Sequence, residues 1–536
     1  MKRYSILILG VTISALLFGY KWIDPEPRIE GHGVVTYYGG AEGVSGSLAV
    51  IRTRDGNFIL DCGSFYPEGE DEPDQLKAIA NRHNQTLPRN VTNAHALLLT
   101  HAHADHIGRV PLLVRRGFAG SIYSTDATKQ LSEVMLEMGI RWEAMNLRQW
   151  EWSGRSEGDF VVVHWNKCEW QKRINNRNRR QFSGDIDSLR KQVQRIDSKS
   201  ISPCKICARI ELKTIMRLFS TIEESKRTSL TENVSAEFFN SSHIPGAVSI
   251  MFYVKHNERY QRVLFSGDVG SDSSALIYAP EIPPAADIIF MEATYGASNQ
   301  VDNSYQQRRE FRQQIVDSLR RNNIVWIPAF ALDRTQKILH ELYLIQKEHP
   351  DLLNDIPVYV PSPSANNFTD IYIKNIANGW FRSGITTSSF EKVKQISHLP
   401  LDAEFAGPMI IITTSGMMDN VLSNQLIPAL GTNADVDIYI VGYQSPITEG
   451  AHIRDNRLVT IDGKEIEIKA SVFSTAAFSG HGRASDMDIW LSNQSKETPI
   501  YLLHGDREAL MERQRDLMDK GWQNVHIAKI SEPINF

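Results

Sequence analysis

The segment His101-Ala-His103-Ala-Asp105-His106 decides the fold. It follows the apolar, strand-like run Ala96–Thr100 directly and precedes the helix-like stretch Ile107–Arg115. A strand that ends in a tight turn projects several side chains into one space, and imidazoles with a carboxylate at this spacing suit zinc. One such cluster serves two ions when a shared oxygen ligand bridges them, and water held between two cations is acidified enough to attack phosphorus. The segment therefore predicts a hydrolytic metal site.

Further ligands are expected at the ends of other strands. Taken singly, each candidate is more often a turn residue or a helix cap than a metal ligand. Their value is collective, because they stand at the ends of several strand-like runs. The candidates are His243 in Ser241-Ser-His-Ile-Pro-Gly246, Asp268 in Phe265-Ser-Gly-Asp-Val-Gly270, and His504 in Tyr501-Leu-Leu-His-Gly-Asp506.

The length and composition describe a globular protein of more than one domain. The chain has 536 residues, of which 42% are hydrophobic and 23% charged, so the signature of disorder is absent. Strand-like runs alternate with helical stretches, which indicates an α/β protein with parallel strands. The net charge of −5 gives no general attraction to nucleic acid, so contact with a polyanion requires local basic patches or bound metal.

The N-terminus has the pattern of a targeting or anchoring segment. Lys2 and Arg3 precede an uncharged apolar run from Ile6 to Tyr20, and Lys21 follows it. No cleavage site with small residues follows this run, which favours an uncleaved membrane anchor over residues 1–29. Basic residues before the run place the enzyme domain outside the cytoplasm. The alternative is a buried N-terminal helix of the fold.

In their order along the chain, many segments resemble the metallo-β-lactamase superfamily, and within it the β-CASP branch of nucleases. This branch includes the cleavage and polyadenylation endonuclease and RNase J. The similarity runs from about Val34 to the C-terminus. The matching segments, beside those quoted above, are Gly43-Val-Ser-Gly-Ser47, Leu60-Asp-Cys-Gly63, Met291-Glu-Ala-Thr-Tyr-Gly296, Ile327-Pro-Ala-Phe-Ala-Leu-Asp-Arg334, Thr414-Ser-Gly-Met417, Val441-Gly-Tyr-Gln444 and Phe478-Ser-Gly-His-Gly482.

The resemblance implies a set of ligands for two zinc ions. By this similarity one ion is held by His101, His103 and His243, and the other by Asp105, His106 and His504. Asp268 would bridge the two ions, and Asp61 would orient a ligand or the bridging water from behind.

The resemblance also implies a mechanism and a substrate. The three additional family motifs correspond to Glu292, His481 and His504. His481 would be the general acid that protonates the leaving oxygen, with Glu292 aligning it, while a zinc-bridged hydroxide attacks in line. Family members that act on RNA resemble this chain at His504, whereas the DNA-repair branch usually has an aliphatic residue there. The expected activity is therefore that of a zinc-dependent ribonuclease.

Two turns resemble the phosphate-contacting loops of the family's cap domain. They contain Ser415 and, in the other turn, Ser362 and Ser364. Ordinary turn chemistry explains serine and glycine there nearly as well. The sequence also departs from the family pattern: Asp333 stands where relatives usually have glycine, and Arg483 follows the motif of the general acid. Substrate handling is therefore expected to differ from that of relatives.

The stretch of about residues 150–205 has an irregular pattern and is interpreted as an insertion. It contains His164 and Cys168, and the pair Cys204 and Cys207 lies at its end, which allows a structural zinc knuckle. The alternative is a set of unlinked cysteines. The basic segment Lys172–Arg180 is either a clamp for a polyanion or a solvated face.

These observations predict an αββα sandwich split by an inserted α/β cap. Residues 30–296 and 469–536 would form the sandwich, and residues 297–468 the β-CASP cap domain. The leading function is cleavage of phosphodiester bonds in RNA. The rivals are a DNA nuclease or another phosphodiesterase working outside the cytoplasm, and a scaffold that binds nucleic acid without cutting it. The expected partners are RNA or other nucleic acid and, through the N-terminal segment, a membrane.

Overall fold

The computed structural model describes residues 29, 31–67, 73–146, 211–296, 303–391, 395–396, 399, 405 and 407–536. The expected N-terminal anchor at Ile6–Tyr20 lies outside these residues. So do the basic segment Lys172–Arg180 and the proposed knuckle of His164, Cys168, Cys204 and Cys207. Within the described ranges, no helix combines the length and the apolar character needed to cross a bilayer.

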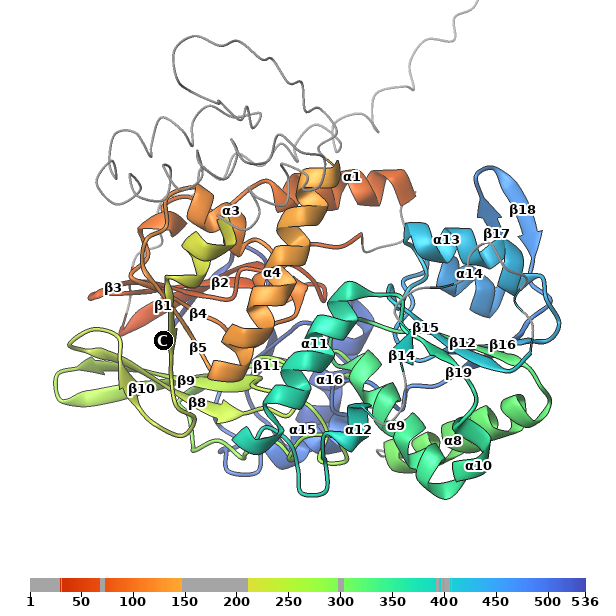
Figure 1. Ribbon diagram of the computed structural model, residues 1–536. Coiled ribbons are helices and arrows are strands. Elements are labelled where there is room, and N and C mark those ends of the chain that lie inside the picture. The colour runs from red at the N-terminus through yellow and green to blue at the C-terminus, as the bar shows by residue number, and fades with distance from the viewer. Residues whose placement is uncertain are drawn as a thin grey trace, which may run out of the picture.

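Two mixed sheets lie face to face and form the left part of the molecule in Figure 1. The first sheet has the order β22 (Pro533–Asn535), β1 (Gly33–Gly39), β2 (Leu48–Thr53), β3 (Gly56–Leu60), β4 (Ala96–Leu98), β5 (Ser121–Ser124) and β6 (Phe219–Thr221). The second has the order β21 (Val525–Ile527), β20 (Ile500–Leu503), β11 (Ile288–Glu292), β10 (Arg259–Phe265), β9 (Val248–His256), β8 (Val234–Asn240) and β7 (Thr228–Ser229).

The alternation of side chains along each strand explains the layers. In β2, Ala49 and Ile51 pack between the two sheets, whereas Leu48 and Val50 point to the opposite face, which helices cover. The helices on this outer face are α3 (Val110–Arg115) and α4 (Asp126–Asn146), with α1 (Pro73–Asn84) and the short α2 (Ala104–Ile107) in the same part of the chain. Two later helices, α15 (Ala484–Trp490) and α16 (Arg507–Asp519), pack on the outer face of the second sheet. The expected αββα sandwich is confirmed.

A third sheet forms the separate lobe on the right of Figure 1. Its strands pair in parallel, in the order β14 (Gln395–Ile396), β13 (Val358–Tyr359), β15 (Met409–Thr413), β12 (Ile324–Pro328), β16 (Val436–Ile440) and β19 (Ser471–Ser474). Strands such as β12 and β15 are mostly apolar and buried throughout because helices cover both faces. A small hairpin of β17 (Leu458–Ile461) and β18 (Lys464–Glu467) completes this lobe.

The helices of this lobe lie on the two faces of its sheet. One apolar cluster joins the sheet to α8 (Ser304–Arg320), α9 (Arg334–Glu348), α10 (Pro350–Leu353), α11 (Pro363–Lys374) and α12 (Ser388–Glu391). The other joins it to α13 (Val421–Leu426) and α14 (Glu449–Asp455). Because β19 pairs with β16, the sheet extends past residue 468, where the sequence analysis placed the end of the cap. We therefore propose a cap domain of residues 297–474 between the two parts of the sandwich.

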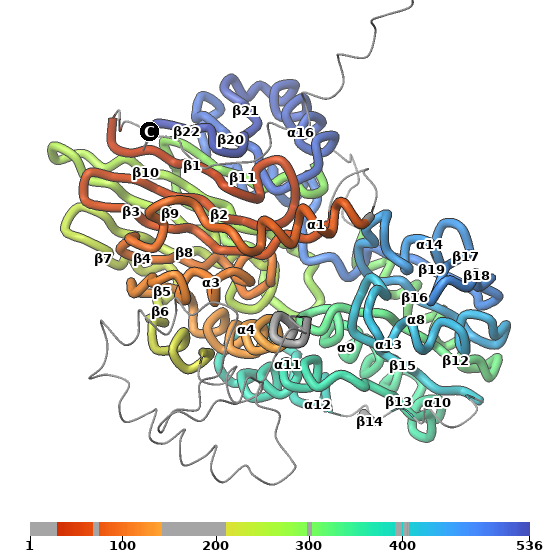
Figure 2. The backbone as a smooth tube through the Cα atoms, turned by 90° about the horizontal axis from the view of Figure 1, so that it is seen from above, coloured from red at the N-terminus to blue at the C-terminus, as the bar shows by residue number. Residues whose placement is uncertain are grey.

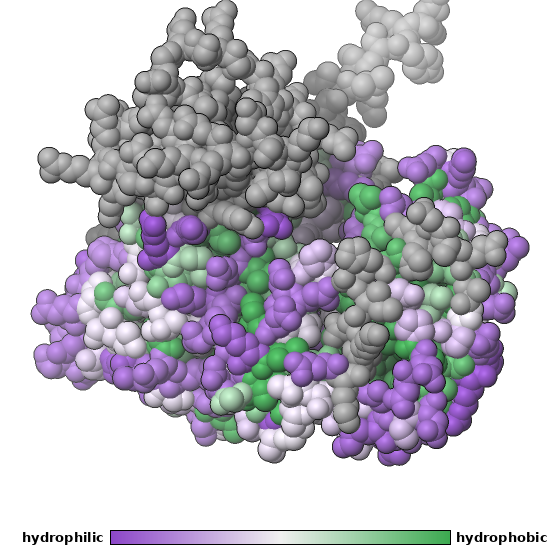
Figure 3. Space-filling view, in the orientation of Figure 1, coloured by the Kyte–Doolittle hydropathy of each residue, from purple (hydrophilic) through white to green (hydrophobic). Residues whose placement is uncertain are grey.

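The cap packs directly on the sandwich through two helices. α4 and α11 lie side by side in both Figure 1 and Figure 2. Between them, the side-chain amide of Asn375 donates a 2.9 Å hydrogen bond to Gln130 Oε1, and Asn375 is only 1% exposed. The face shown in Figure 3 is mostly hydrophilic, with apolar side chains in small separate patches. The buried apolar cluster that includes Leu131 of α4 also includes Phe368 of α11.

Candidate active site

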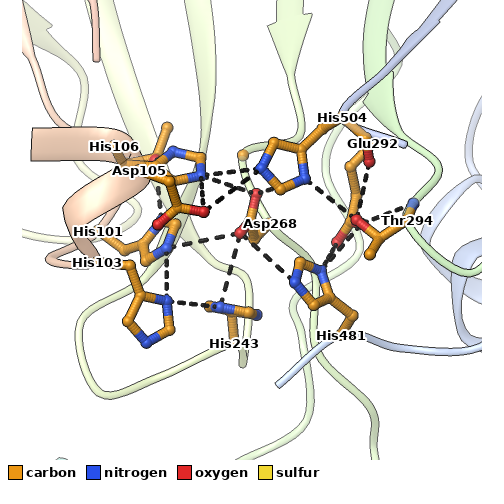
Figure 4. Close-up of polar contacts among 12 residues, drawn as sticks. His101, His103, Asp105, His106, His243, Asp268, Glu292, Thr294, His481 and His504 are labelled. Carbon is orange, nitrogen blue, oxygen red and sulfur yellow. Dashed lines mark hydrogen bonds and ion pairs between the residues drawn. The ribbon is translucent and has the colours of Figure 1, made fainter. Parts of the chain in front are cut away.

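The predicted metal-binding side chains all leave the sheets at the ends of strands. Asp61 follows β3, and the turn after β4 carries His101 and His103 before α2 begins at Ala104. The other positions follow strands of the second sheet, where His243 comes after β8, Asp268 after β10 and His504 after β20. Since both sheets direct these ends to one edge of the sandwich, residues far apart in sequence meet there (Figure 4).

Asp268 lies at the centre of the cluster. Its Oδ1 is 3.3 Å from His106 Nε2 and 3.7 Å from His504 Nδ1. Its Oδ2 is 3.6 Å from the Nε2 atoms of both His101 and His243. The two carboxylate oxygens therefore face two different groups of imidazoles, as Figure 4 shows.

The first group consists of His101, His103 and His243. His103 Nδ1 lies 3.1 Å from His101 Nε2 and 3.0 Å from His243 Nε2. Burial lowers the pKa of His103 to about 4 and also lowers the pKa values of His101 and His243. These imidazoles are therefore neutral near pH 7, and a neutral imidazole offers the lone pair that a metal ion requires.

The second group consists of Asp105, His106 and His504. His106 Nε2 is 3.3 Å from His504 Nε2, and Asp105 Oδ2 lies 4.0 Å from His106 Nε2 and 3.9 Å from His504 Nε2. Burial alone would lower the pKa of His106, but Asp268 and Asp61 raise it well above its ordinary value. Burial alone would likewise raise the pKa of Asp268, but the neighbouring histidines, His106 first, lower it well below its ordinary value.

Asp61 holds His106 from behind. Its Oδ2 lies 2.8 Å from His106 Nδ1 and accepts a 2.8 Å hydrogen bond from the Thr100 hydroxyl. Its Oδ1 accepts from the backbone N–H of Thr100, at 2.8 Å. The turn fits closely, because a Cβ on Gly63 would lie 1.5 Å from the carbonyl oxygen of Asp105. The arrangement fixes the ring of His106 with its Nε2 toward the centre of the site.

His481 and Glu292 form a pair on the other side of Asp268. His481 Nδ1 is 3.0 Å from each carboxylate oxygen of Glu292, and His481 Nε2 is 3.9 Å from Asp268 Oδ2. Glu292 Oε1 also accepts a 2.7 Å hydrogen bond from the backbone N–H of Val269. Burial alone would lower the pKa of His481, but the charge and hydrogen bond of Glu292 raise it above its ordinary value.

The serines expected to contact phosphate lie in the cap, outside this cluster. Ser362 caps α11, and its hydroxyl is 3.1 Å from that of Ser364 and 2.9 Å from that of Thr414. Ser415 hydrogen-bonds to the carboxylate of Asp419. That carboxylate would repel a phosphate at Ser415, and the hydroxyls of Ser362 and Ser364 contact protein groups. A phosphate role for these serines stays a prediction.

Two neighbours of the site carried no predicted role. The hydroxyl of Thr294 lies 3.1 Å from His504 Nδ1 and donates a 2.8 Å hydrogen bond to the His504 carbonyl. Thr100 binds Asp61 and lies 3.1 Å from His101 Nδ1. Both residues stand within the motifs quoted above. The position of Thr294, two residues after Glu292, could have indicated that it lies near the site. Their partners depend on contacts between strands, which a sequence does not show.

Comparisons with known proteins match three parts of the chain. The family model "Metallo-beta-lactamase superfamily" matches residues 41–159, "Beta-Casp domain" matches residues 335–453, and "Zn-dependent metallo-hydrolase RNA specificity domain" matches residues 465–528. The chain belongs to the β-CASP branch of the metallo-β-lactamase superfamily. Membership in this superfamily, together with the His and Asp clusters, implies that the site binds divalent metal.

Similar proteins of this branch cover most of the chain. A ribonuclease of Thermus thermophilus is 25% identical over 93% of this chain and 98% of its own length. A transcription termination factor of Methanosarcina mazei is 23% identical over 89% of this chain and 68% of its own. An RNase J-like protein of Methanocaldococcus jannaschii is 21% identical over 88% of this chain and 93% of its own.

The expected location of this β-CASP protein is corrected by these comparisons. The sequence predicted a membrane-anchored enzyme outside the cytoplasm, from the apolar run Ile6–Tyr20. The relatives that match about nine tenths of the chain are named as a ribonuclease and as transcription termination factors. The predictions of a membrane anchor and of a membrane partner were therefore wrong. They rested on the hydropathy of this run and the residues that flank it, and an apolar run of this length is ambiguous.

Proposed function

We propose that this β-CASP protein is a zinc-dependent ribonuclease that hydrolyses phosphodiester bonds at the cluster around Asp268. The observation that carries the proposal is the position of Asp268, with one carboxylate oxygen toward each group of imidazoles. The match to an RNA specificity domain and the ribonuclease among the relatives favour RNA as substrate.

The donor atoms fit two zinc ions. His101, His103 and His243 would hold one ion, Asp105, His106 and His504 the other, and Asp268 would lie between them. Nitrogen and carboxylate oxygen donors in sets of this size are those that zinc prefers in catalytic sites. When bound, zinc supplies Lewis acidity, which acidifies water and neutralises charge on a phosphate. Asp61 would keep His106 oriented toward its ion through the Nδ1 contact.

His481 would supply the proton for the leaving oxygen. Its Nδ1 faces Glu292, so its Nε2 points to the centre of the site and is the atom that donates. As the bond from phosphorus to the leaving oxygen breaks, that oxygen takes the proton from Nε2, and the positive imidazole becomes neutral. Glu292 keeps His481 protonated to higher pH and fixes its ring. The contacts of these residues thus support the proposed catalytic roles of His481, Glu292, Asp268 and Asp61.

Two other functions remain as alternatives. A DNA nuclease or another phosphodiesterase would use the same metal site, and only the substrate separates it from a ribonuclease. A scaffold that binds nucleic acid without cutting it does not need a complete set of metal ligands. The described residues bring all seven proposed ligands and the His481–Glu292 pair together, which favours an enzyme.

Incubation of the purified protein with labelled single-stranded RNA and DNA, in the presence of zinc, tests the proposal. We expect RNA to be cut, and we expect His481→Ala and Asp268→Ala to abolish the cutting. His526→Ala is the matched control, because His526 is exposed on β21 at the edge of the second sheet. Cutting of DNA alone would support the first alternative, and binding of RNA without cutting would support the scaffold.

A further inference from the structure

The cap extends a charged cluster toward the metal site at the start of α9. Asp333 precedes this helix and has a backbone φ of 71° and ψ of −52°. The N–H of Arg334 donates a 2.9 Å hydrogen bond to the carbonyl of Leu332, which closes a tight γ-turn around Asp333. A positive φ of this kind is strained for a residue with a Cβ, whereas glycine adopts it without cost. A compensating interaction is therefore expected for the Asp333 side chain.

The compensation is a buried ion cluster. Asp333 is fully buried, and its Oδ2 lies 2.7 Å from Lys337 Nζ and 3.0 Å from Arg334 Nη1. Lys337 is itself only 4% exposed. One carboxylate between two cations leaves the cluster with a net positive charge. A carboxylate that accepts from both cations in a buried place fixes their positions, and loss of one partner leaves the others without compensation.

The guanidinium of Arg334 reaches the metal site from this cluster. Its Nη1 is 3.2 Å from the place that a Cβ on Gly480 would occupy, and that same place lies 2.6 Å from His243 Cε1. Arg334 therefore approaches the loop that carries Gly480 and His481, at a point close to His243.

The hydrogen-bonding groups of Arg334 are only partly used. Nη1 binds Asp333, while Nε is buried and has no hydrogen-bond partner within the part of the chain that the structure describes. The side chain is 11% exposed. A buried donor without a partner is costly, and the planar fork of arginine suits two oxygens of a phosphate. The partly exposed guanidinium of Arg334 thus keeps donors that an anionic group of the substrate could use.

We propose that Arg334 binds a phosphate oxygen of the RNA next to the scissile bond, and that Asp333 and Lys337 hold its guanidinium in place. The proposal rests on the proposed ribonuclease function. It makes Arg334 a contact of the cap with the substrate, placed beside His481. Asp333 is then a positioning residue, which acts through Arg334 and does not itself touch RNA.

The test measures the salt dependence of RNA binding in full-length protein that carries His481→Ala, so that RNA stays intact. Each phosphate contact to single-stranded nucleic acid adds about 0.7 to the slope of log affinity against log salt. We expect Arg334→Gln to lower this slope by about 0.7 and to weaken binding about tenfold at low salt. Arg320→Gln is the control, since Arg320 is an exposed arginine at the C-terminal end of α8 and outside the cluster of Asp333, Arg334 and Lys337.

Two further variants separate substrate contact from a structural role. Their salt slope is measured in the His481→Ala background, and their KM in protein with His481 intact. Arg334→Lys keeps the charge, so the slope should return to that of the parent and KM should recover in part. Asp333→Asn keeps both cations but releases the guanidinium, so KM should rise while the slope stays unchanged. If Arg334→Gln matches Arg320→Gln in slope and affinity, while the otherwise unaltered protein cleaves RNA, the inference about Arg334 is wrong and the proposed ribonuclease function stands. If the unaltered protein cleaves no RNA, the proposed function fails first.

Discussion

His481 Nδ1 lies 3.0 Å from both carboxylate oxygens of Glu292, so one acid holds the ring of the proposed general acid in a single orientation. The two residues are 189 positions apart in the chain and come from different parts of the sandwich. Glu292 is buried at the end of β11, and its Oε1 accepts a hydrogen bond from the backbone N–H of Val269, next to Asp268. The orientation of His481 is thereby tied to the strand end that carries Asp268.

Removal of this acid should change the pH dependence of cleavage. Glu292 raises the pKa of His481 against the opposite effect of burial. A general acid acts while protonated, so activity is lost as pH rises through its pKa. Glu292→Gln should therefore move the alkaline limb of the kcat profile to lower pH and reduce kcat. His481→Ala should lower kcat by about 10² to 10⁴ and remove that limb. An alkaline limb at unchanged pH in Glu292→Gln would assign it to another group.

Loss of Asp268 should reduce the metal content of the purified protein. Because Asp268 faces both groups of imidazoles, Asp268→Asn removes an anionic ligand from each ion at once. We expect a metal content near two zinc ions per chain in the unaltered protein and clearly less in the variant, measured by elemental analysis. Asp287→Asn is the control, because Asp287 pairs with Arg262 at the opposite end of β11. Equal zinc in the two variants would contradict the bridging role.

Chelation should destabilise the protein as well as inactivate it. A ligand that binds only the folded state stabilises it in proportion to RT ln(1 + [L]/Kd), so removal of zinc should lower the melting temperature. Activity should return on addition of zinc. A protein whose activity and melting temperature both survive a strong chelator would not use this site as proposed.

The sequence could predict those features of the fold and of the site whose pattern lies within one segment of the chain. His101, His103, Asp105 and His106 lie in one turn, so their spacing alone indicated a metal site. The expected alternation of strands and helices appears, for example, in β12 (Ile324–Pro328) and α8 (Ser304–Arg320), because apolar runs and helical spacing lie within one segment of the chain. Distant partners such as His243 and His504 required the collective pattern and the family resemblance.

Contacts between distant segments could not be predicted. Thr294 and His504 meet across two strands that pair in parallel, and nothing in either segment indicates that register. The pairing of β19 with β16 likewise depends on the cap sheet as a whole. The close approach of Arg334 to the loop at Gly480 likewise depends on how the cap packs on the sandwich. The sequence indicates side chains, but not which of them face one another across a domain boundary.

Gly480→Ala should disturb the metal site through a single methyl group. A Cβ at this position would lie 2.6 Å from His243 Cε1 and 2.9 Å from its Nδ1, so the imidazole or the loop must move. We expect lower zinc content and at least tenfold lower kcat, with little change in far-ultraviolet circular dichroism. Gly139→Ala is the matched control, because no atom lies within 4 Å of its added Cβ and alanine is favoured in a helix by about 1 kcal/mol. Full zinc content in Gly480→Ala would contradict the close approach.

His340 should make the stability of the cap dependent on pH. It lies on α9, is 8% exposed, and its Nδ1 is buried without a partner among the described residues. Burial, with the charges of Arg308, Arg312 and Lys347, lowers its pKa from 6.5 to about 4. Between these values the unfolded chain binds a proton that the folded chain does not, so stability falls as pH decreases, by about 2 kcal/mol at pH 5. His340→Gln should lose less stability than the unaltered protein between pH 7 and pH 5, measured by urea unfolding, whereas the exposed His452→Gln should behave like the unaltered protein. Equal losses in all three proteins would show that His340 is protonated in the folded state.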